Sequence, residues 1–234
     1  MKRFFLLICS LMLILSGLTG CGKKGKSEPK YPTYVTDAPR VPTAAPVPDT
    51  TDYNAEARAA FASLIVPEQE SFSYTVTDGT ATIIGYVGTE TAFRIPETLG
   101  DCPVVGISAT AFAGRNDLTV LALPATAEQL AAGVFADCTA LTALQTTFPE
   151  AGYIGFLFGA GAAEQNNAPA LRNIRYLELI GAVSDLPEKS FYGCKDLTAV
   201  LFPETVQTIG NAAFRYCEGL KYINADRQIG RAHV

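Results

Sequence analysis

Histidine is almost missing from this sequence: the 234 residues include one, His233, beside the C-terminus. Histidine is the commonest general base and activates serine and cysteine nucleophiles. The chain also lacks a Cys-x-x-Cys pair and a Gly-x-Ser-x-Gly pattern, and Gly159-Ala160-Gly161 is not followed by the Lys-Ser/Thr of a phosphate-binding loop. We therefore expect no catalytic residue, no metal site and no cofactor.

Basic residues are scarce in the larger part of the chain. Residues 49–226 contain 21 Asp and Glu against 9 Lys and Arg, a net charge of −12, whereas the whole chain has −5. Binding to a phosphate backbone needs a basic surface. We therefore expect no nucleic-acid partner.

The first 20 residues have the layout of a secretory signal. Met1-Lys2-Arg3 is a short positive region, residues 4–15 are apolar apart from Ser10, and residues 16–20 are small or apolar. The four residues at the end of this region, Leu18-Thr19-Gly20-Cys21, resemble the lipobox of bacterial lipoproteins. In a lipobox the cysteine is lipidated and becomes the new N-terminus. This resemblance implies that Cys21 is lipidated and holds the protein at the outer face of a membrane. The alternative is an ordinary signal peptide with a cysteine near its cleavage site.

A tether is expected over residues 21–50. Four lysines lie close to Cys21, where basic residues near an anionic membrane surface contribute about 1 kcal/mol each. Six prolines follow between residues 29 and 48. Proline-rich segments form extended, semi-rigid spacers.

The C-terminal residues 227–234 do not continue the pattern described next. Residues 228–234, QIGRAHV, match the translation of a common sequencing-library adaptor. We therefore expect the natural protein to be longer and His233 not to be native.

An internal repeat with a regular period organises the rest of the chain. Phe112 and Phe135 are 23 residues apart, as are Phe191 and Phe214, and leucine and cysteine positions recur at the same interval. Two copies cover residues 118–140 and 197–219. We expect a longer, degenerate copy over 171–196, an earlier one over 93–117, and the start of another at Leu220.

A period of roughly 20–29 residues that begins Leu-x-x-Leu-x-Leu indicates a leucine-rich repeat. One short strand per unit cannot bury its apolar side chains alone, so neighbouring units stack into a parallel sheet with a continuous core. The predicted fold is a β-rich α/β, right-handed leucine-rich-repeat solenoid over residues 71–226, with parallel strands on its concave face. The predicted inward side chains are those of Leu118, Leu121, Leu123, Leu197, Val200 and Phe202, with Leu130, Phe135, Ile209 and Phe214 filling the core from the convex side.

The repeat also resembles a particular family. Its pattern P-x-x-x-x-x-I-G-x-x-A-F-x-x-C-x-x-L, seen from Pro203 to Leu220, is similar to the BspA-type leucine-rich repeats of bacterial surface proteins. Residues 78–112 resemble the first unit of such arrays, although Arg115 replaces the cysteine of its unit. This resemblance implies a surface-displayed protein associated with adhesion to host or neighbouring cells.

Two segments depart from the period. Residues 141–170 are expected to form an enlarged unit, in which the aromatic run around residues 153–158 fills the core. Upstream, Asp52 is expected to cap a helix within residues 51–66, which would serve as the polar terminal cap that solenoids need.

Four cysteines remain after Cys9 and Cys21, and three of them occupy the repeat's own cysteine position: Cys138, Cys194 and Cys217. We expect buried free thiols there. Because Cys194 and Cys217 occupy equivalent places in adjacent units, a disulfide between them is the alternative.

Binding is the remaining chemistry. Side chains alternate along a strand, so the residues between the inward leucines face the concave surface. The candidate ligand-binding residues, apart from the lipidated Cys21, are Val120, Ala122, Gln145, Asn173, Arg175, Leu201, Tyr222 and Asn224. Arg175 and Tyr222 are the strongest candidates, since both residue types are enriched at interfaces.

The sequence therefore predicts an extracytoplasmic, lipid-anchored and non-catalytic protein that recognises a protein ligand through its repeats. Two alternatives remain: a scaffold whose repeats carry a further domain, and an enzyme whose catalytic domain follows the present C-terminus.

Overall fold

The computed structural model describes residues 51–165 and 168–224. The predictions for the signal, Cys21, the tether and the C-terminal tail lie outside these described residues. Within residues 51–165 and 168–224, no helix combines the length and the apolar character that a membrane crossing requires.

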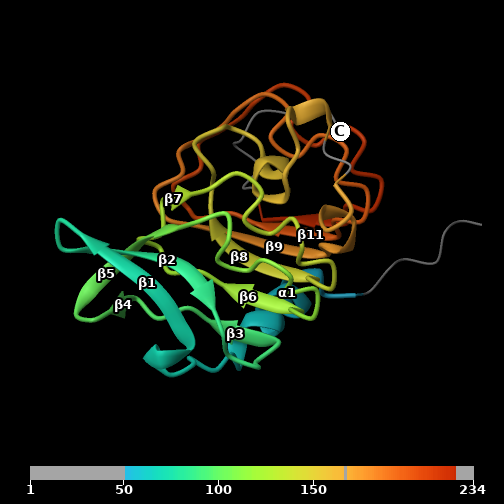
Figure 1. The fold of residues 1–234 in the computed structure, drawn as a ribbon. Coiled ribbons are helices and arrows are strands. Elements are labelled where there is room, and N and C mark those ends of the chain that lie inside the picture. The colour runs from blue at the N-terminus through green and yellow to red at the C-terminus, as the bar shows by residue number, and fades with distance from the viewer. Residues whose placement is uncertain (1–50, 166–167, 225–234) are drawn as a thin grey trace, which may run out of the picture. The chain divides into compact units, whose positions relative to one another are not determined.

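The repeat strands form a six-stranded sheet, in which every pairing is parallel (Figure 1). Leu118, Leu121 and Leu123 are fully buried beneath it, and the equivalent residues of the later unit are at most 6 % exposed. The predicted stacked repeats and their inward side chains are therefore confirmed. In spatial order the strands are β13 (Tyr222–Ile223), β11 (Ala199–Leu201), β9 (Tyr176–Ile180), β8 (Ala143–Thr147), β6 (Val120–Ala122) and β3 (Ala92–Arg94).

A second, interrupted series of strands lies on the other side of the core. Its first part joins β2 (Thr80–Tyr86), β5 (Cys102–Ile107) and β7 (Gln129–Leu130) in parallel. Its second part pairs β10 (Asp185–Leu186) with β12 (Thr208–Ile209). Within the described residues, the unit that begins at Leu141 contributes β8 to the six-stranded sheet but no strand to this second series. The series is therefore interrupted between β7 and β10.

An antiparallel hairpin precedes β5, made by β1 (Phe72–Thr77) and β2. Asp78 and Gly79 connect the two strands, both with positive φ (49° and 75°), as tight two-residue hairpins require. This hairpin extends the β2–β5–β7 series at its N-terminal side. A short 3₁₀ turn, η1 (Gln69–Ser71), precedes it, and β4 (Thr98–Leu99) pairs antiparallel with β5.

Phenylalanine rings stack from unit to unit through the core. The rings of Phe112 and Phe135 are 5.8 Å apart, Phe135 and Phe158 are also 5.8 Å apart, and Phe191 and Phe214 are 4.9 Å apart. Phe158 ends the 3₁₀ helix η2 (Ile154–Phe158), in which Ile154, Leu157 and Phe158 are buried in the core, as predicted, whereas Phe156 is only partly buried. Since Phe158 follows Phe135 at the spacing that separates Phe135 from Phe112, the unit after Leu141 keeps the period further than we predicted.

The longer copy predicted over 171–196 is wrong in its starting point. Leu177 pairs with Leu144 and with Val200, which places Leu177 at the middle leucine of the repeat. The unit therefore begins at Ile174 and has the same length as the regular copies. The extra residues lie between Phe158 and Ile174, and they include the 3₁₀ turns η3 (Ala163–Gln165) and η4 (Leu171–Asn173).

Arg115, which departs from the family pattern, makes specific contacts where other units have a cysteine. Its guanidinium donates to the carbonyl oxygens of Gly88 at 2.9 Å and Glu90 at 2.8 Å, and it forms an ion pair with Asp117 at 2.8 Å. It also lies over the Tyr86 ring, 5.0 Å from the centroid. Arg115 therefore fixes the loop that leads into β3.

Candidate functional site

The face of the six-stranded sheet that points away from the core is the surface where we predicted a ligand. We call it the outer sheet face. Strand pairing aligns its side chains in two rows across the sheet. One row is Val120, Ala143, Tyr176, Ala199 and Tyr222, and the other is Arg94, Ala122, Gln145, Glu178 and Leu201.

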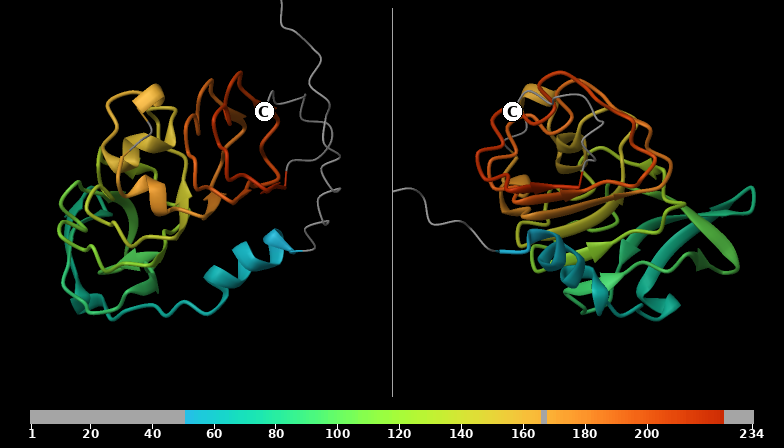
Figure 2. Two further views of the ribbon diagram at one scale, coloured as in Figure 1. Left: turned by 90° about the vertical axis from the view of Figure 1, so that its right-hand side faces the viewer. Right: turned by 180° about the vertical axis from the view of Figure 1, so that it is seen from behind.

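The helix α1 (Tyr53–Ala62) covers much of the outer sheet face. It contacts β6, β8, β9 and β11, and Figure 2 shows it lying along the sheet, outside the stacked turns of the repeats. The Asp52 side chain accepts a hydrogen bond from the Ala55 N–H at 3.0 Å, so the predicted N-cap is confirmed. The expected role as a terminal cap is wrong, because the helix packs on the side of the solenoid rather than over its end.

Two buried side chains hold α1 to the sheet. Ala57 packs against Ala199 and Leu201 and is fully buried. One turn later, Phe61 packs against Ala122 and Ala143 and is 5 % exposed. Residues four apart share one face of a helix, and small residues on the sheet allow the helix to approach closely. Alanines on the outer sheet face therefore make a shallow seat for a helix.

A side-chain hydrogen bond also joins α1 to the sheet. The Tyr176 hydroxyl donates to the Glu56 carboxylate at 2.7 Å. This hydrogen bond, together with burial, raises the pKa of Tyr176 above its ordinary value. Tyr53 and Tyr222 flank the same cluster of Ala57, Ala199 and Leu201.

A polar row crosses the same face. The Arg94 Nη1 donates to Gln145 Oε1 at 2.6 Å, and the Gln145 Nε2 donates to Glu178 Oε2 at 2.7 Å. Gln145 is 9 % exposed and lies between the two charged groups, so these hydrogen bonds span four neighbouring strands, from β3 across β6 and β8 to β9. Gln145 and Glu178 therefore form a polar pair between Ala122 and Leu201, which pack against α1.

Most of the predicted ligand residues lie on the outer sheet face. Val120, Ala122, Gln145, Leu201 and Tyr222 do, and four of them, Val120, Ala122, Leu201 and Tyr222, pack in the clusters formed with α1. No motif in the sequence indicates that a helix covers these residues. Any ligand that contacts these four residues must share the face with α1 or displace it.

Asn173 and Arg175 do not belong to the outer sheet face, because the unit begins three residues later than we assumed. Tyr176 and Glu178 occupy the expected positions instead. Counting back from Phe191 by the offset between Leu118 and Phe135 would have given this register from the sequence. Asn173 and Arg175 line a separate hollow of about 410 Å³ together with Arg172 and Asp196.

Asn224 has a structural partner. Its side-chain amide accepts from the Phe202 N–H at 2.6 Å and donates to the Phe202 carbonyl at 2.9 Å. The side chain thus continues the backbone pairing of β11 where β13 ends. Its side-chain amide is already engaged by the protein.

The cysteines of the described residues are free thiols, as predicted. Cys217 Sγ donates to the Phe191 carbonyl at 3.0 Å, and its hydrogen bond with Cys194, together with burial, raises the pKa of the Cys194 thiol. Burial raises the pKa of Cys138 to about 12. Within the same part of the chain, no group of His, Cys, Asp and Glu side chains is arranged to hold a metal ion.

Comparison with protein families identifies the repeat. The model of the BspA type leucine rich repeat region matches residues 102–154 and 166–232 in six copies, just over half of the chain. The chain therefore belongs to the BspA-type leucine-rich-repeat family. A comparison with curated protein sequences finds no match.

Two solved structures are similar to this chain at low identity. A leucine rich repeat protein of T. pallidum has 21 % identity and a TM-score of 0.42, over 67 % of this chain and 70 % of that chain. A leucine rich cell surface protein of Faecalibacterium prausnitzii has 20 % identity and a TM-score of 0.29, over 65 % of this chain and 52 % of that chain. This chain thus matches about half the length of the second protein.

Proposed function

We propose that this chain is a lipid-anchored, non-catalytic binding protein of the bacterial surface, whose repeat domain recognises a protein ligand through the outer sheet face. The observation that carries the proposal is the seating of α1 on that face. A surface that accommodates one amphipathic helix has the shape and the apolar side chains to accept another. We expect the ligand to present a helix or a similar apolar ridge in an adhesive contact with a host or neighbouring cell.

In this proposal α1 is an internal competitor. Because α1 and the sheet belong to one chain, the helix occupies the face at a high effective concentration. A ligand that needs Ala122 and Leu201 gains access only when α1 leaves, so its apparent affinity falls in proportion to the open population. Weakening the contact of α1 should therefore strengthen ligand binding.

The test uses the ectodomain with Cys21→Ser, immobilised and exposed to host matrix proteins and to extracts of bacterial surfaces. The proposal predicts saturable binding that rises with Phe61→Ala, which removes the larger anchor of α1. It also predicts that Leu201→Arg, added to Phe61→Ala, abolishes the gain. Ala59→Gln is the matched control, since Ala59 is exposed on the same helix and glutamine is a good helix former.

Two outcomes would contradict this function. One is an absence of saturable binding to both kinds of material. The other is binding that neither Phe61→Ala nor Leu201→Arg changes, which would place the ligand away from the outer sheet face.

The anchor is tested separately. The native chain should fractionate with membranes and incorporate a labelled fatty acid, while Cys21→Ser should do neither. Release of the unsubstituted protein into the soluble fraction, without label, would contradict the lipid anchor and leave the repeat domain's binding role open to its own test.

A further inference from the structure

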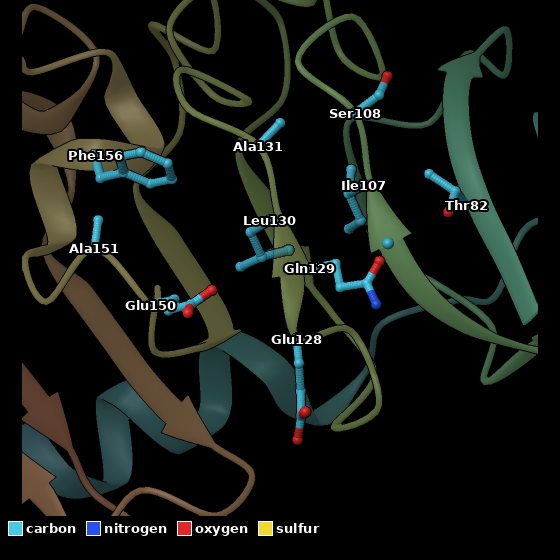
Figure 3. Close-up of a pocket in the computed structure, with 11 residues that line it drawn as sticks. Thr82, Ile107, Ser108, Glu128, Gln129, Leu130, Ala131, Glu150, Ala151 and Phe156 are labelled. Atoms are coloured by element: carbon cyan, nitrogen blue, oxygen red, sulfur yellow. The ribbon is translucent and has the colours of Figure 1, made fainter.

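The side of the solenoid opposite the outer sheet face carries a groove where the second strand series is interrupted. We call it the β7 groove, and its volume is about 620 Å³. Figure 3 shows Phe156, Ala151 and Glu150 on one side of Leu130, with Ile107, Ser108 and Thr82 on the other. Its lining includes Ile107, Glu128, Gln129, Leu130, Glu150 and Phe156.

One edge of β7 faces this groove without a neighbouring strand. The Ala131 N–H donates to the Ile107 carbonyl at 3.0 Å, which orients Ala131 toward β5. Successive residues of a parallel strand direct their N–H and C=O groups to opposite sides. The N–H and C=O of Leu130 therefore point away from β5, and no other segment of the described residues bonds to them.

The next unit of the chain does not close this edge. In a regular array, residues 152–154 would pair with Leu130. Instead, the Ile154 N–H donates to the Ser190 carbonyl at 2.9 Å and the Gly152 N–H donates to Pro149. The chain rejoins the previous unit only at Phe156, whose carbonyl accepts from Gly133 at 2.8 Å. Leu130 thus keeps the backbone groups of an edge strand inside a groove.

A pair of strands elsewhere in the chain shows what such an edge accepts. β10 is the equivalent of β7, and β12 pairs with it in parallel, with Thr208 opposite Asp185 and Ile209 opposite Leu186. The Gly210 N–H completes the pairing by donating to the Leu186 carbonyl at 2.7 Å. An occupant of the β7 edge would match this pattern with a polar residue opposite Gln129 and an aliphatic residue opposite Leu130.

Charge selects among such occupants. Glu128 and Glu150 line the groove, and among the described residues no lysine or arginine does. Glu128 directly precedes Gln129, the first residue of β7. In a bound parallel strand, the residue opposite Glu128 is therefore the one just before the polar residue. A lysine or arginine in that place meets the carboxylates, whereas an acidic residue is repelled.

We propose that the β7 groove binds an extended peptide segment of a partner protein, which adds a parallel strand to the free edge of β7. The segment carries a basic residue, a polar residue and an aliphatic residue in succession. Backbone hydrogen bonds with Leu130 hold it, and side-chain contacts in the groove select it, as in other cases of strand addition. This site is separate from the outer sheet face and does not depend on the function proposed above.

The probe is a fluorescent peptide that copies residues 205–211 with Gln207→Lys, which gives the sequence TVKTIGN. Binding to the Cys21→Ser chain is measured by fluorescence anisotropy. The matched peptides carry Gln207→Glu or, on the lysine version, Gly210→Pro, which removes the N–H equivalent to the one that Leu186 accepts. We expect saturable binding of the lysine peptide, about fivefold weaker binding of the glutamate peptide, since an exposed ion pair contributes up to about 1 kcal/mol, and loss of binding with proline, which has no N–H to donate.

Two protein measurements locate the peptide. Glu128→Gln combined with Glu150→Gln should remove the preference for lysine over glutamate without changing the fold. Hydrogen exchange should show new protection of the Leu130 amide when the lysine peptide is bound, with none at Tyr222 and Ile223, which lie at one edge of the six-stranded sheet. Protection at 222–223 alone, equal binding of the three peptides, or no binding up to millimolar concentration would each overturn the proposal.

Discussion

The continuous phenylalanine stack gives a quantitative prediction for the irregular unit. Phe135 is fully buried and lies 5.8 Å from the Phe158 ring, which is 2 % exposed. Replacing either ring by leucine keeps a large apolar side chain, so each substitution should cost no more than about 1.5 kcal/mol of unfolding free energy. This leaves the domain folded in the double variant, because domains are typically stable by about 5–15 kcal/mol.

The informative quantity is the coupling between the two rings. Aromatic pairs at this separation contribute about 0.5–1.5 kcal/mol beyond the area that they bury. Phe135→Leu, Phe158→Leu and the double variant should therefore deviate from additivity by that amount. Urea unfolding of the four proteins measures the coupling, and an unchanged dependence on urea shows that the same transition is compared.

Phe135 and Phe214 form the control pair, because they belong to different parts of the stack. Their substitutions should add within about 0.5 kcal/mol, as for residues without shared contacts. If Phe135 and Phe158 also behave additively, Phe158 does not continue the stack, and the account of the irregular unit is refuted.

Three further predictions concern single groups. Arg115→Met should destabilise the domain by roughly 1–3 kcal/mol in urea, since it leaves two loop carbonyls without their donor, and Arg115→Lys should recover only part of this. Cys138 should resist iodoacetamide at pH 8 while the protein is folded, and because its folded pKa is raised to about 12, its contribution to stability should be lost as the pH rises from about 9 toward 12. The hydrogen bond of Tyr176 should stabilise α1 at neutral pH and be lost as the pH rises through the raised folded pKa of Tyr176. Amide exchange of α1 should therefore accelerate at alkaline pH, and Tyr176→Phe should remove this additional pH dependence.

The repeat itself was accessible from the sequence because its signal is local and recurs. Leucines and phenylalanines at a fixed spacing identify the strands, the inward side chains and the family. The irregular unit was harder to place, since residues 159–173 interrupt the spacing and Leu171 imitates the first leucine of a unit. Only the distance from Phe191 distinguishes Leu171 from Ile174.

The position of α1 could not be derived in the same way. A cap and a helical composition predict that residues 53–62 form a helix, but they do not identify the surface that it covers. Its contacts with Ala199 and Leu201 join two distant parts of the sequence. The sequence indicates this packing only through complementary size, since Phe61 on the helix is large and the strands carry small residues. Many other pairs of surfaces would match in size equally well.

The free edge of β7 was equally hidden. The sequence shows that the unit after Leu141 is enlarged, but not which pairing is lost. That depends on where the Ile154 N–H finds its partner, and the Ser190 carbonyl that accepts it belongs to the following unit, beyond the extra residues.

If a ligand and α1 compete for the outer sheet face, digestion with trypsin can detect the competition. Arg58 lies within α1, and cleavage after it requires the helix to open locally. Binding is reciprocal, so a ligand that excludes α1 must raise the open population of the helix. The protein ligand captured by the ectodomain is first purified. The rate of cleavage after Arg58 is then measured while increasing amounts of this ligand are added to the ectodomain. Competition requires this rate to rise with ligand occupancy, and a rate that stays constant or falls would show that the ligand does not displace α1.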